Sequence, residues 1–243
     1  MSAPTDTSSP PTPILVGGQR VAYTIRRSTR ARHSSIHIHP RRGLEVVLPL
    51  GVPTTTAATL LRKEARWLAK HAGELHRATR TPPPLQTGVQ LPLRGHWYTL
   101  TLNPSPTPRA VRTGDTLLVS TPHPHDPTAV RAQLERWYRN LARRFITDRV
   151  HALHDTADPP VARITIRDQQ TRWASCSNNG SLSFNWRLVM APPTVLDAVV
   201  AHELVHLTVH NHSRRFWRAL DQRFPQHRAC RRWLHHNGPR LTL

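Results

Sequence analysis

The order of apolar and polar positions predicts strands in the first half of the chain. Short segments in which apolar and polar residues partly alternate, each bounded by an Arg-rich or a Pro/Gly turn, are typical of antiparallel strands. They occupy residues 21–25, 34–38, 44–48, 91–102 and 110–120. Prolines within residues 103–108 would interrupt pairing between the last two segments. A strand-rich N-terminal region is therefore expected.

Helical periodicity takes over toward the C-terminus. Apolar residues recur there at three-and-four spacing, mostly behind residues that commonly cap helices. The predicted helices run from Thr54 to about His76, from Asp126 to before Pro159, from Thr194 to about Thr208, from Ser213 to Phe224 and from Gln226 to His236. Between the second and third helices, residues 161–166 and 181–186 are strand candidates, linked by a loop that contains the turn-forming residues Asn178, Asn179 and Gly180.

These patterns predict an α+β chain in four parts. Residues 1–19 are expected to be a disordered tail, 20–125 a strand-rich region with one helix, 126–159 a connecting helix, and 160–243 a C-terminal domain. The tail lacks the basic and then apolar start of a signal peptide. No run of about 18 apolar residues occurs, so we expect no membrane-spanning helix.

The chain is strongly basic. Its 34 Lys and Arg residues against 14 Asp and Glu residues give a formal net charge of +20 at pH 7. Such a charge attracts polyanions, which predicts weak nucleic-acid contact through the basic surface. Lysine occurs only at Lys63 and Lys70, however, and a bias toward arginine in the source genome would give the same charge without a nucleic-acid partner. Two cysteines, Cys176 and Cys230, are too few for a disulfide framework, which indicates a reducing compartment and a cytoplasmic location.

Candidate chemistry is concentrated in the predicted helix that starts at Thr194. His202 and His206 are four residues apart, which places both imidazoles on one helix face, about 5–6 Å apart at their Cβ atoms. Their nitrogens can then converge on one zinc ion, and Glu203 is placed to act on the attacking water as general base without being a ligand. A chance match in a chain with 17 histidines is the alternative, but burying Glu and His in an apolar helix without a metal would be costly.

A catalytic zinc needs a third protein ligand, and the sequence points to a histidine. After Glu203 the only side-chain carboxylate is Asp221, so a downstream glutamate ligand is excluded. His210 would lie about 12 Å along a straight helix from His202, too far to share the ion. His212 is better placed, because Asn211 tolerates a turn that can bring the His212 ring back toward the metal.

Several further segments resemble the YgjP-like metallopeptidases, which are zinc peptidases related to the WLM and SprT-like groups. The shared segments are residues 172–177 (RWASCS), 185–188 (NWRL), 191–193 (APP), the helix signature from His202 to His206, and 211–217 (NHSRRFW). Ala174 stands where that family usually has Gly. The resemblance implies a zincin-like domain with its metal site on a helix, and it implies His212 as third ligand. It also implies that the strand around residues 182–186 lies beside the helix and pairs with an extended peptide substrate. A metzincin is rejected, since it requires Gly at Val209 and a downstream methionine turn.

Other polar residues near these segments receive structural interpretations. Cys176 is expected to have a packing or turn role, and Arg172 and Arg187 to lie on a solvated face. His227 and the pair His235 and His236 are candidates for a hydrogen bond to the transition state, with nothing to establish it.

Together these features predict a zinc metallopeptidase that hydrolyses peptides or proteins, with His202, His206 and His212 as ligands and Glu203 as general base. Two rivals stay open. One is a DNA-associated protease or a basic nucleic-acid-binding module, and the other is a zinc hydrolase with a substrate other than a peptide.

Overall fold

The computed structural model describes residues 12–16, 19–39, 43–71, 84–169 and 172–243, and it separates into two compact units, residues 1–81 and 82–243. The expected tail lies outside the described residues up to position 11. Residues 12–16, which were also assigned to the tail, instead form a strand that pairs with its neighbour. The last residues predicted for the first helix, 72–76, are likewise outside the description.

The first unit is a sheet covered by helices. Its elements are β1 (Thr12–Val16), β2 (Gln19–Ser28), β3 (Ser35–His39), β4 (Gly43–Pro49), α1 (Thr55–Lys63) and α2 (Ala65–Lys70), with strand order β1-β2-β4-β3. The helix predicted from Thr54 is thus divided at Glu64, and the Thr54 side chain makes no capping hydrogen bond. Ile25 of β2, Val46 of β4 and Leu61 of α1 belong to its core.

One prediction about this sheet was wrong. The strands were expected to be antiparallel, but β2 and β4 run parallel, with Ile25 opposite Val46. The chain passes from β2 to the outer strand β3 and then returns through β4, which lies between them. The alternation of apolar residues within a strand carries no information about the direction of its neighbour.

The second unit contains a sheet with the same arrangement. Its strands are β5 (Gln90–Leu93), β6 (His96–Pro104), β7 (Arg109–Thr113) and β8 (Thr116–Thr121), in the order β5-β6-β8-β7. As in the first unit, the central pair is parallel and both outer pairs are antiparallel. The same strand topology therefore occurs twice, although the sequence shows no repeat. Because this sheet belongs to the second compact unit, the unit boundary at 81 differs from the predicted division at 125.

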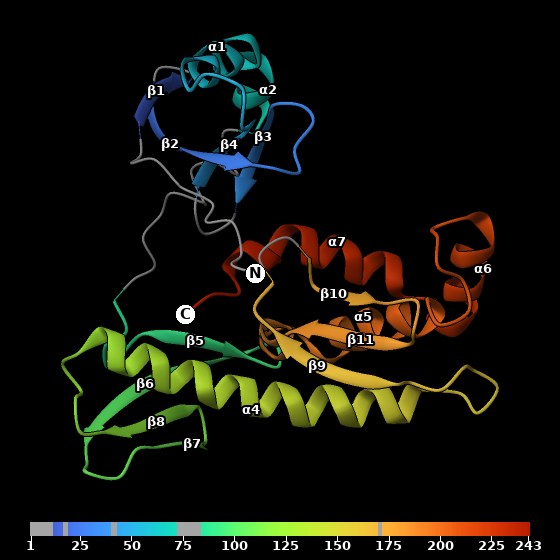
Figure 1. Cartoon of the computed structure of the whole chain (residues 1–243). Coiled ribbons are helices and arrows are strands. Elements are labelled where there is room, and N and C mark those ends of the chain that lie inside the picture. The colour runs from blue at the N-terminus through green and yellow to red at the C-terminus, as the bar shows by residue number, and fades with distance from the viewer. Residues whose placement is uncertain (1–11, 17–18, 40–42, 72–83, 170–171) are drawn as a thin grey trace, which may run out of the picture. The chain divides into compact units, whose positions relative to one another are not determined.

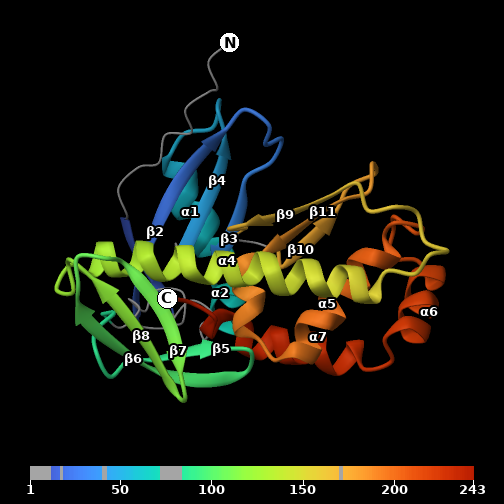
Figure 2. The same cartoon turned by 90° about the horizontal axis from the view of Figure 1, so that it is seen from below.

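A long helix joins this sheet to the last part of the chain. α4 (Pro127–Leu153) begins at the predicted cap, where the Asp126 side chain accepts a hydrogen bond from the amide of Thr128 at 2.8 Å. One side of α4 buries apolar residues from Val130 to Val150. Figures 1 and 2 show α4 passing the strands β5–β8 and then the elements that follow it. Most of the second unit therefore shares one hydrophobic core, and a smaller core cluster is formed by Ala201, Val205, Val209, Phe216 and Leu220.

The remaining elements form a small sheet and a group of helices. They are β9 (Arg163–Arg167), β10 (Ala174–Cys176), β11 (Ser181–Asn185), the short 3-10 helices η1 (Trp186–Met190) and η2 (Gly238–Arg240), α5 (Pro193–Val205), α6 (Arg214–Arg223) and α7 (His227–Asn237). β11 lies between β10, which is antiparallel to it, and β9, which is parallel. Gly180 has a positive φ of 76° in the turn between β10 and β11.

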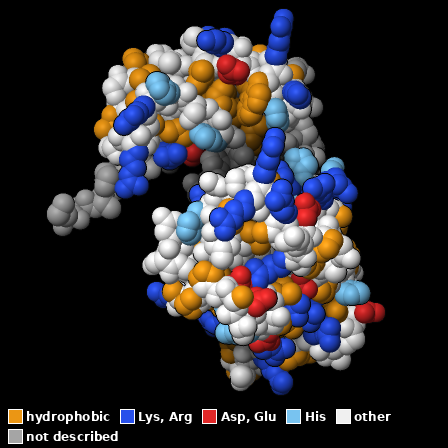
Figure 3. Space-filling view, turned by 90° about the vertical axis from the view of Figure 1, so that its right-hand side faces the viewer, with side chains coloured by type: hydrophobic (Ala, Val, Ile, Leu, Met, Phe, Trp, Pro, Cys, Tyr) orange, Lys and Arg blue, Asp and Glu red, His pale blue; other side chains and the backbone are white. Residues whose placement is uncertain are grey.

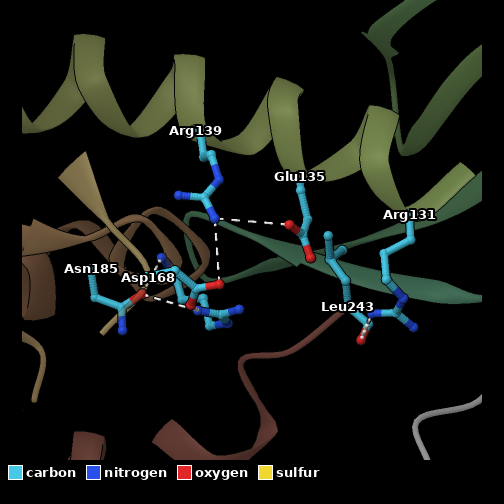
Figure 4. Close-up of polar contacts among 7 residues, drawn as sticks. Arg131, Glu135, Arg139, Asp168, Asn185 and Leu243 are labelled. Carbon is cyan, nitrogen blue, oxygen red and sulfur yellow. Dashed lines mark hydrogen bonds and ion pairs between the residues drawn. The ribbon is translucent and has the colours of Figure 1, made fainter. Parts of the chain in front are cut away.

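Two groups of ion pairs fix these elements. Arg149 of α4 makes a two-point contact with Asp197 of α5, at 2.7 and 3.1 Å. Asp168, after β9, is contacted by Arg139 of α4 at 3.4 Å (Figure 4). Arg187 of η1 also contacts Asp168. Arg187 is only 4% exposed, so its predicted place on a solvated face was wrong, and it links η1 to the segment after β9.

Candidate metal centre

The three histidines predicted as ligands come together at the end of α5. The Nε2 atom of His212 lies 3.1 Å from that of His202 and 3.2 Å from that of His206, and the three potential ligand atoms all lie within 4.8 Å of one another. His202 lies in α5 and His206 follows directly as its C-terminal cap, whereas His212 comes from the loop that leads into α6. Nitrogens bound tetrahedrally at about 2.1 Å to one zinc would be separated by about 3.4 Å. The spacing therefore fits a single ion.

The loop that carries His212 turns as the sequence suggested. Asn211 accepts a hydrogen bond from the amide of Ser213 at 3.3 Å through its side-chain oxygen, which closes a tight turn. Phe216, completely buried on α6, packs against all three imidazoles, with ring centroids 4.5–4.8 Å away. The turn and this apolar ring together hold His212 against α5.

The hydrogen bonds of His206 leave a lone pair facing the cluster. Its Nδ1 lies 2.9 Å from the carbonyl oxygen of Val209. A carbonyl only accepts hydrogen bonds, so Nδ1 carries the proton and Nε2 is the free nitrogen. Histidine ligands commonly donate a hydrogen bond from the ring nitrogen that faces away from the metal, because this bond fixes the ring orientation and the tautomer.

Burial favours the neutral form that a metal ligand needs. It is the main cause that lowers the pKa of His202 to about 3, and the neighbouring rings of His206 and His212 lower it further. Burial also lowers the pKa of His206, although the hydrogen bond to Val209 acts in the opposite direction. Both imidazoles are therefore unprotonated at neutral pH, and the donor set fits a divalent cation.

Glu203 is a buried carboxyl group on the same helix. It is 5% exposed, and its Oε2 atom has no hydrogen-bond partner in the part of the chain that the structure describes. Burial raises its pKa to about 8, while the charge of Arg172 and a hydrogen bond from the backbone of Cys176 oppose that rise. Arg172, predicted to be merely solvated, is thus exposed but acts electrostatically on this carboxyl group.

The strand beside Glu203 is β10 rather than β11. The carbonyl of Trp173 accepts from the amide of Asn185, and the amide of Ser177 donates to Ser181, so residues 173, 175 and 177 face β11. In an antiparallel pair the intervening residues point the other way, which leaves the backbone of Ala174 and Cys176 on the open edge. The expectation that residues 182–186 pair with a substrate was wrong, because β11 is paired on both sides.

A close contact with η2 supports this edge strand. A Cβ atom on Gly238 would lie 2.7 Å from Cζ2 of Trp173, the residue just before β10, so a side chain there would displace the indole. Ala174, where glycine was expected from the resemblance, lies in an ordinary strand. The substitution therefore leaves the local backbone unstrained.

Asp221 and Arg231 contribute to the surroundings of the site and were not assigned to it from the sequence. Asp221 accepts a hydrogen bond at 2.8 Å from Nε2 of His227, which is 5% exposed and stacks on Trp217. Arg231 lowers the pKa of His202 as one of its smaller causes. His227, Cys230, Arg231 and Leu234 recur at the spacing of one helix face, which is the signal that could have identified the Arg231 position. His236, by contrast, bonds back to the carbonyl of Arg232 on its own helix.

Comparison with known proteins identifies one family. A family model described as YgjP-like, metallopeptidase domain, matches residues 32–237. No curated protein and no solved structure matches the chain. The match spans His202, Glu203, His206 and His212.

Proposed function

Since the chain belongs to the YgjP-like metallopeptidase family, which implies a metal cofactor and a peptide or protein substrate, we propose that it is a zinc-dependent peptidase. His202, His206 and His212 would hold the zinc, and Glu203 would be the general base. The observation that carries this proposal is the convergence of three Nε2 atoms, since those of His202 and His206 lie 3.1 and 3.2 Å from that of His212. Three imidazole ligands with one open position are typical of catalytic zinc. When bound, zinc supplies a Lewis acid that lowers the pKa of water and polarises a carbonyl group.

Glu203 has the surroundings that a general base needs. The amide of Cys176 holds the carboxylate, while Oε2 has no partner among the described residues and is free to accept a proton from water. Without a bound cation, burial raises its pKa to about 8, and a cation beside it would favour the ionised form, which is the form that accepts a proton. Once protonated, the same oxygen can pass the proton to the leaving amine.

The open edge of β10 would hold the substrate backbone. An extended peptide can add to a strand edge through main-chain hydrogen bonds, here to the backbone of Ala174 and to the carbonyl of Cys176, and such pairing tolerates many side chains. Because Cys176 donates its amide to Glu203, a peptide paired there would lie next to the base. The edge thus supports peptide hydrolysis over hydrolysis of a small molecule.

We propose a cytoplasmic location and only weak nucleic-acid contact. Cys176 and Cys230 are both free thiols, as expected in a reducing compartment. Lys and Arg side chains are spread over the face in Figure 3, which supports electrostatic attraction of polyanions in general. No helix in the described ranges has the length and apolar character to cross a membrane.

Replacement of the base tests the proposal. Glu203→Gln should keep one zinc per chain, measured by atomic emission after dialysis, and lose at least about 100-fold in the rate of peptide cleavage. Glu135→Gln, a change of the same kind on α4, is the matched control and should cleave like the unmodified chain. Full activity in Glu203→Gln would refute the assignment of the base, and an unmodified chain that takes up no zinc would refute the metal site.

A further inference from the structure

An apolar cavity opens directly beside His202 and Glu203. Its volume is about 260 Å³. Apart from these two residues, much of its wall is apolar and comes from α5, α6 and α7, including Val199, Leu220 and Leu234. At roughly 30 Å³ for each water molecule, the space equals about nine waters, which is enough for the side chain of leucine, methionine or phenylalanine.

A second cavity, of about 500 Å³, continues from the first along α7 and is strongly basic. The two cavities share Trp217, His227 and Arg231 in their walls, and the second adds Arg228, Arg232 and His235. Arg228 pairs with Asp221 at 3.0 Å. Arg231 and Arg232 have no carboxylate partner among the described residues. The basic cavity therefore carries uncompensated positive charge close to the candidate metal centre.

We propose that the two cavities select substrates in which a large apolar residue is next to an acidic residue. The apolar side chain enters the cavity beside His202, and the carboxylate of its neighbour lies against Arg231 and Arg232. This inference rests on the proposed peptidase function, since it places the apolar residue beside the bond to be cleaved. Burial of the apolar side chain gives affinity, and the exposed guanidinium groups contribute mainly selectivity and rate of association.

The walls favour a peptide over a nucleic acid. The apolar cavity, which is lined by Val199 and Leu234, offers no favourable contact to a charged phosphate backbone. Trp217, the aromatic residue that both cavities share, is already stacked on His212 and His227, which leaves less of its face for a base. A side chain with an apolar body matches the recess, and a neighbouring carboxylate matches the charge.

Binding can be measured separately from cleavage. The full-length Glu203→Gln protein, with zinc added, would be titrated with four fluorescein-labelled peptides that differ only at a central pair: Leu-Glu, Ala-Glu, Leu-Gln or Leu-Lys. Fluorescence anisotropy should give at least tenfold weaker binding for Ala-Glu than for Leu-Glu, because most of the buried apolar area is lost. Leu-Lys should bind roughly fivefold or more weakly, and this difference should shrink as salt is added.

Variants assign each preference to its cavity. Val199→Phe, which narrows the recess, should reduce the preference for Leu over Ala. The double change Arg231→Glu and Arg232→Glu should remove or reverse the preference for Glu over Lys. Arg143→Glu, an exposed arginine of α4 that lines neither cavity, is the control for net charge and should leave both preferences unchanged.

The outcomes separate this inference from the proposed function. Three results would each overturn the inference. The four peptides could bind equally, or their preferences could survive in the cavity variants. A DNA duplex could also displace the peptides while the protein shows no preference for Leu over Ala. If the unmodified chain cleaves a peptide mixture without these preferences, only the selectivity is wrong. If the preferences hold and the zinc-loaded chain cleaves nothing, the cavities bind such peptides and the peptidase function fails.

Discussion

Removal of one proposed ligand should abolish most of the stabilisation that bound zinc would give to the fold. His212 is suited to this test because it is exposed in a loop, so His212→Ala removes a proposed ligand without opening a hole in the core. His210→Ala is the matched control. It removes another exposed histidine of the same loop, which lies outside the cluster of His202, His206 and His212. The two variants therefore differ in whether the histidine that is removed belongs to the proposed metal site.

The expected effect follows from mass action. A ligand at 100 times its dissociation constant raises the free energy of unfolding by about 2.7 kcal/mol. For a unit the size of residues 82–243, that corresponds to a rise in Tm of about 5–11 °C. Loss of a ligand weakens binding by at least about 100-fold, because loss of a partner that merely orients a ligand costs 10- to 100-fold. At the same zinc concentration His212→Ala should then gain at most about 0.4 kcal/mol, or 1–2 °C.

Differential scanning calorimetry of protein first treated with EDTA and then titrated with zinc measures this difference. The unmodified chain and His210→Ala should show the full rise in Tm, and His212→Ala should show almost none. A full rise in His212→Ala would refute the three-histidine site. Loss of the rise in His210→Ala would indicate that the loop binds zinc through a different set of residues.

Three further predictions concern the surroundings of the site. Phe216→Ala should lower the free energy of unfolding by about 3–5 kcal/mol in urea titrations and weaken zinc binding, since the three imidazoles lose their common support; unchanged zinc affinity would contradict that role. Burial raises the pKa of Cys176 to about 11, so iodoacetamide should modify it far more slowly at pH 8 than it modifies the denatured chain, and Cys176→Ser should still cleave peptide; rapid modification would restore a reactive thiol. Because the pKa of His202 is lowered to about 3, the unfolded chain takes up a proton at this residue before the folded chain does as the pH falls below about 6.5. The free energy of unfolding of the metal-free protein should therefore decrease between about pH 6.5 and 3, and it should decrease less in His202→Gln. Equal pH dependence in the two proteins would show that His202 is not the cause.

The local elements were largely predictable from the sequence, but their neighbours were not. Asp126 caps α4 as expected, because a capping bond involves only residues close in the chain. β10 was not predicted, since three residues, Ala174–Cys176, show no alternation and form a strand only because β11 lies beside them. The parallel pairing of β9 with β11 has the same origin, because strand direction is decided by the tertiary path.

The candidate site divides in a similar way. His202 and His206 are positioned by helix geometry alone, so their spacing sufficed to bring them together. His212 required a judgement about a turn, which the hydrogen bond from Ser213 to Asn211 supports. The contributions of His227 and Arg231 depend on how α7 packs against α5. The spacing within α7 indicates which residues share a helix face, but it does not indicate the element against which that face packs.

The composition of α5 gives an independent reason to expect a ligand at this site. Most residues of α5 are buried, among them Leu196, Val200 and Leu204, so packing alone would favour an apolar residue at position 203 as well. Glu203 instead leaves a buried oxygen without a partner among the described residues, and such a group costs about 1–3 kcal/mol, or more when charged. Polar groups that oppose local packing in this way are expected at functional sites, where binding offsets the stability they cost. A bound cation would also favour the ionised form of Glu203, so the buried carboxyl group and the neutral histidines beside it are consistent with one and the same ligand.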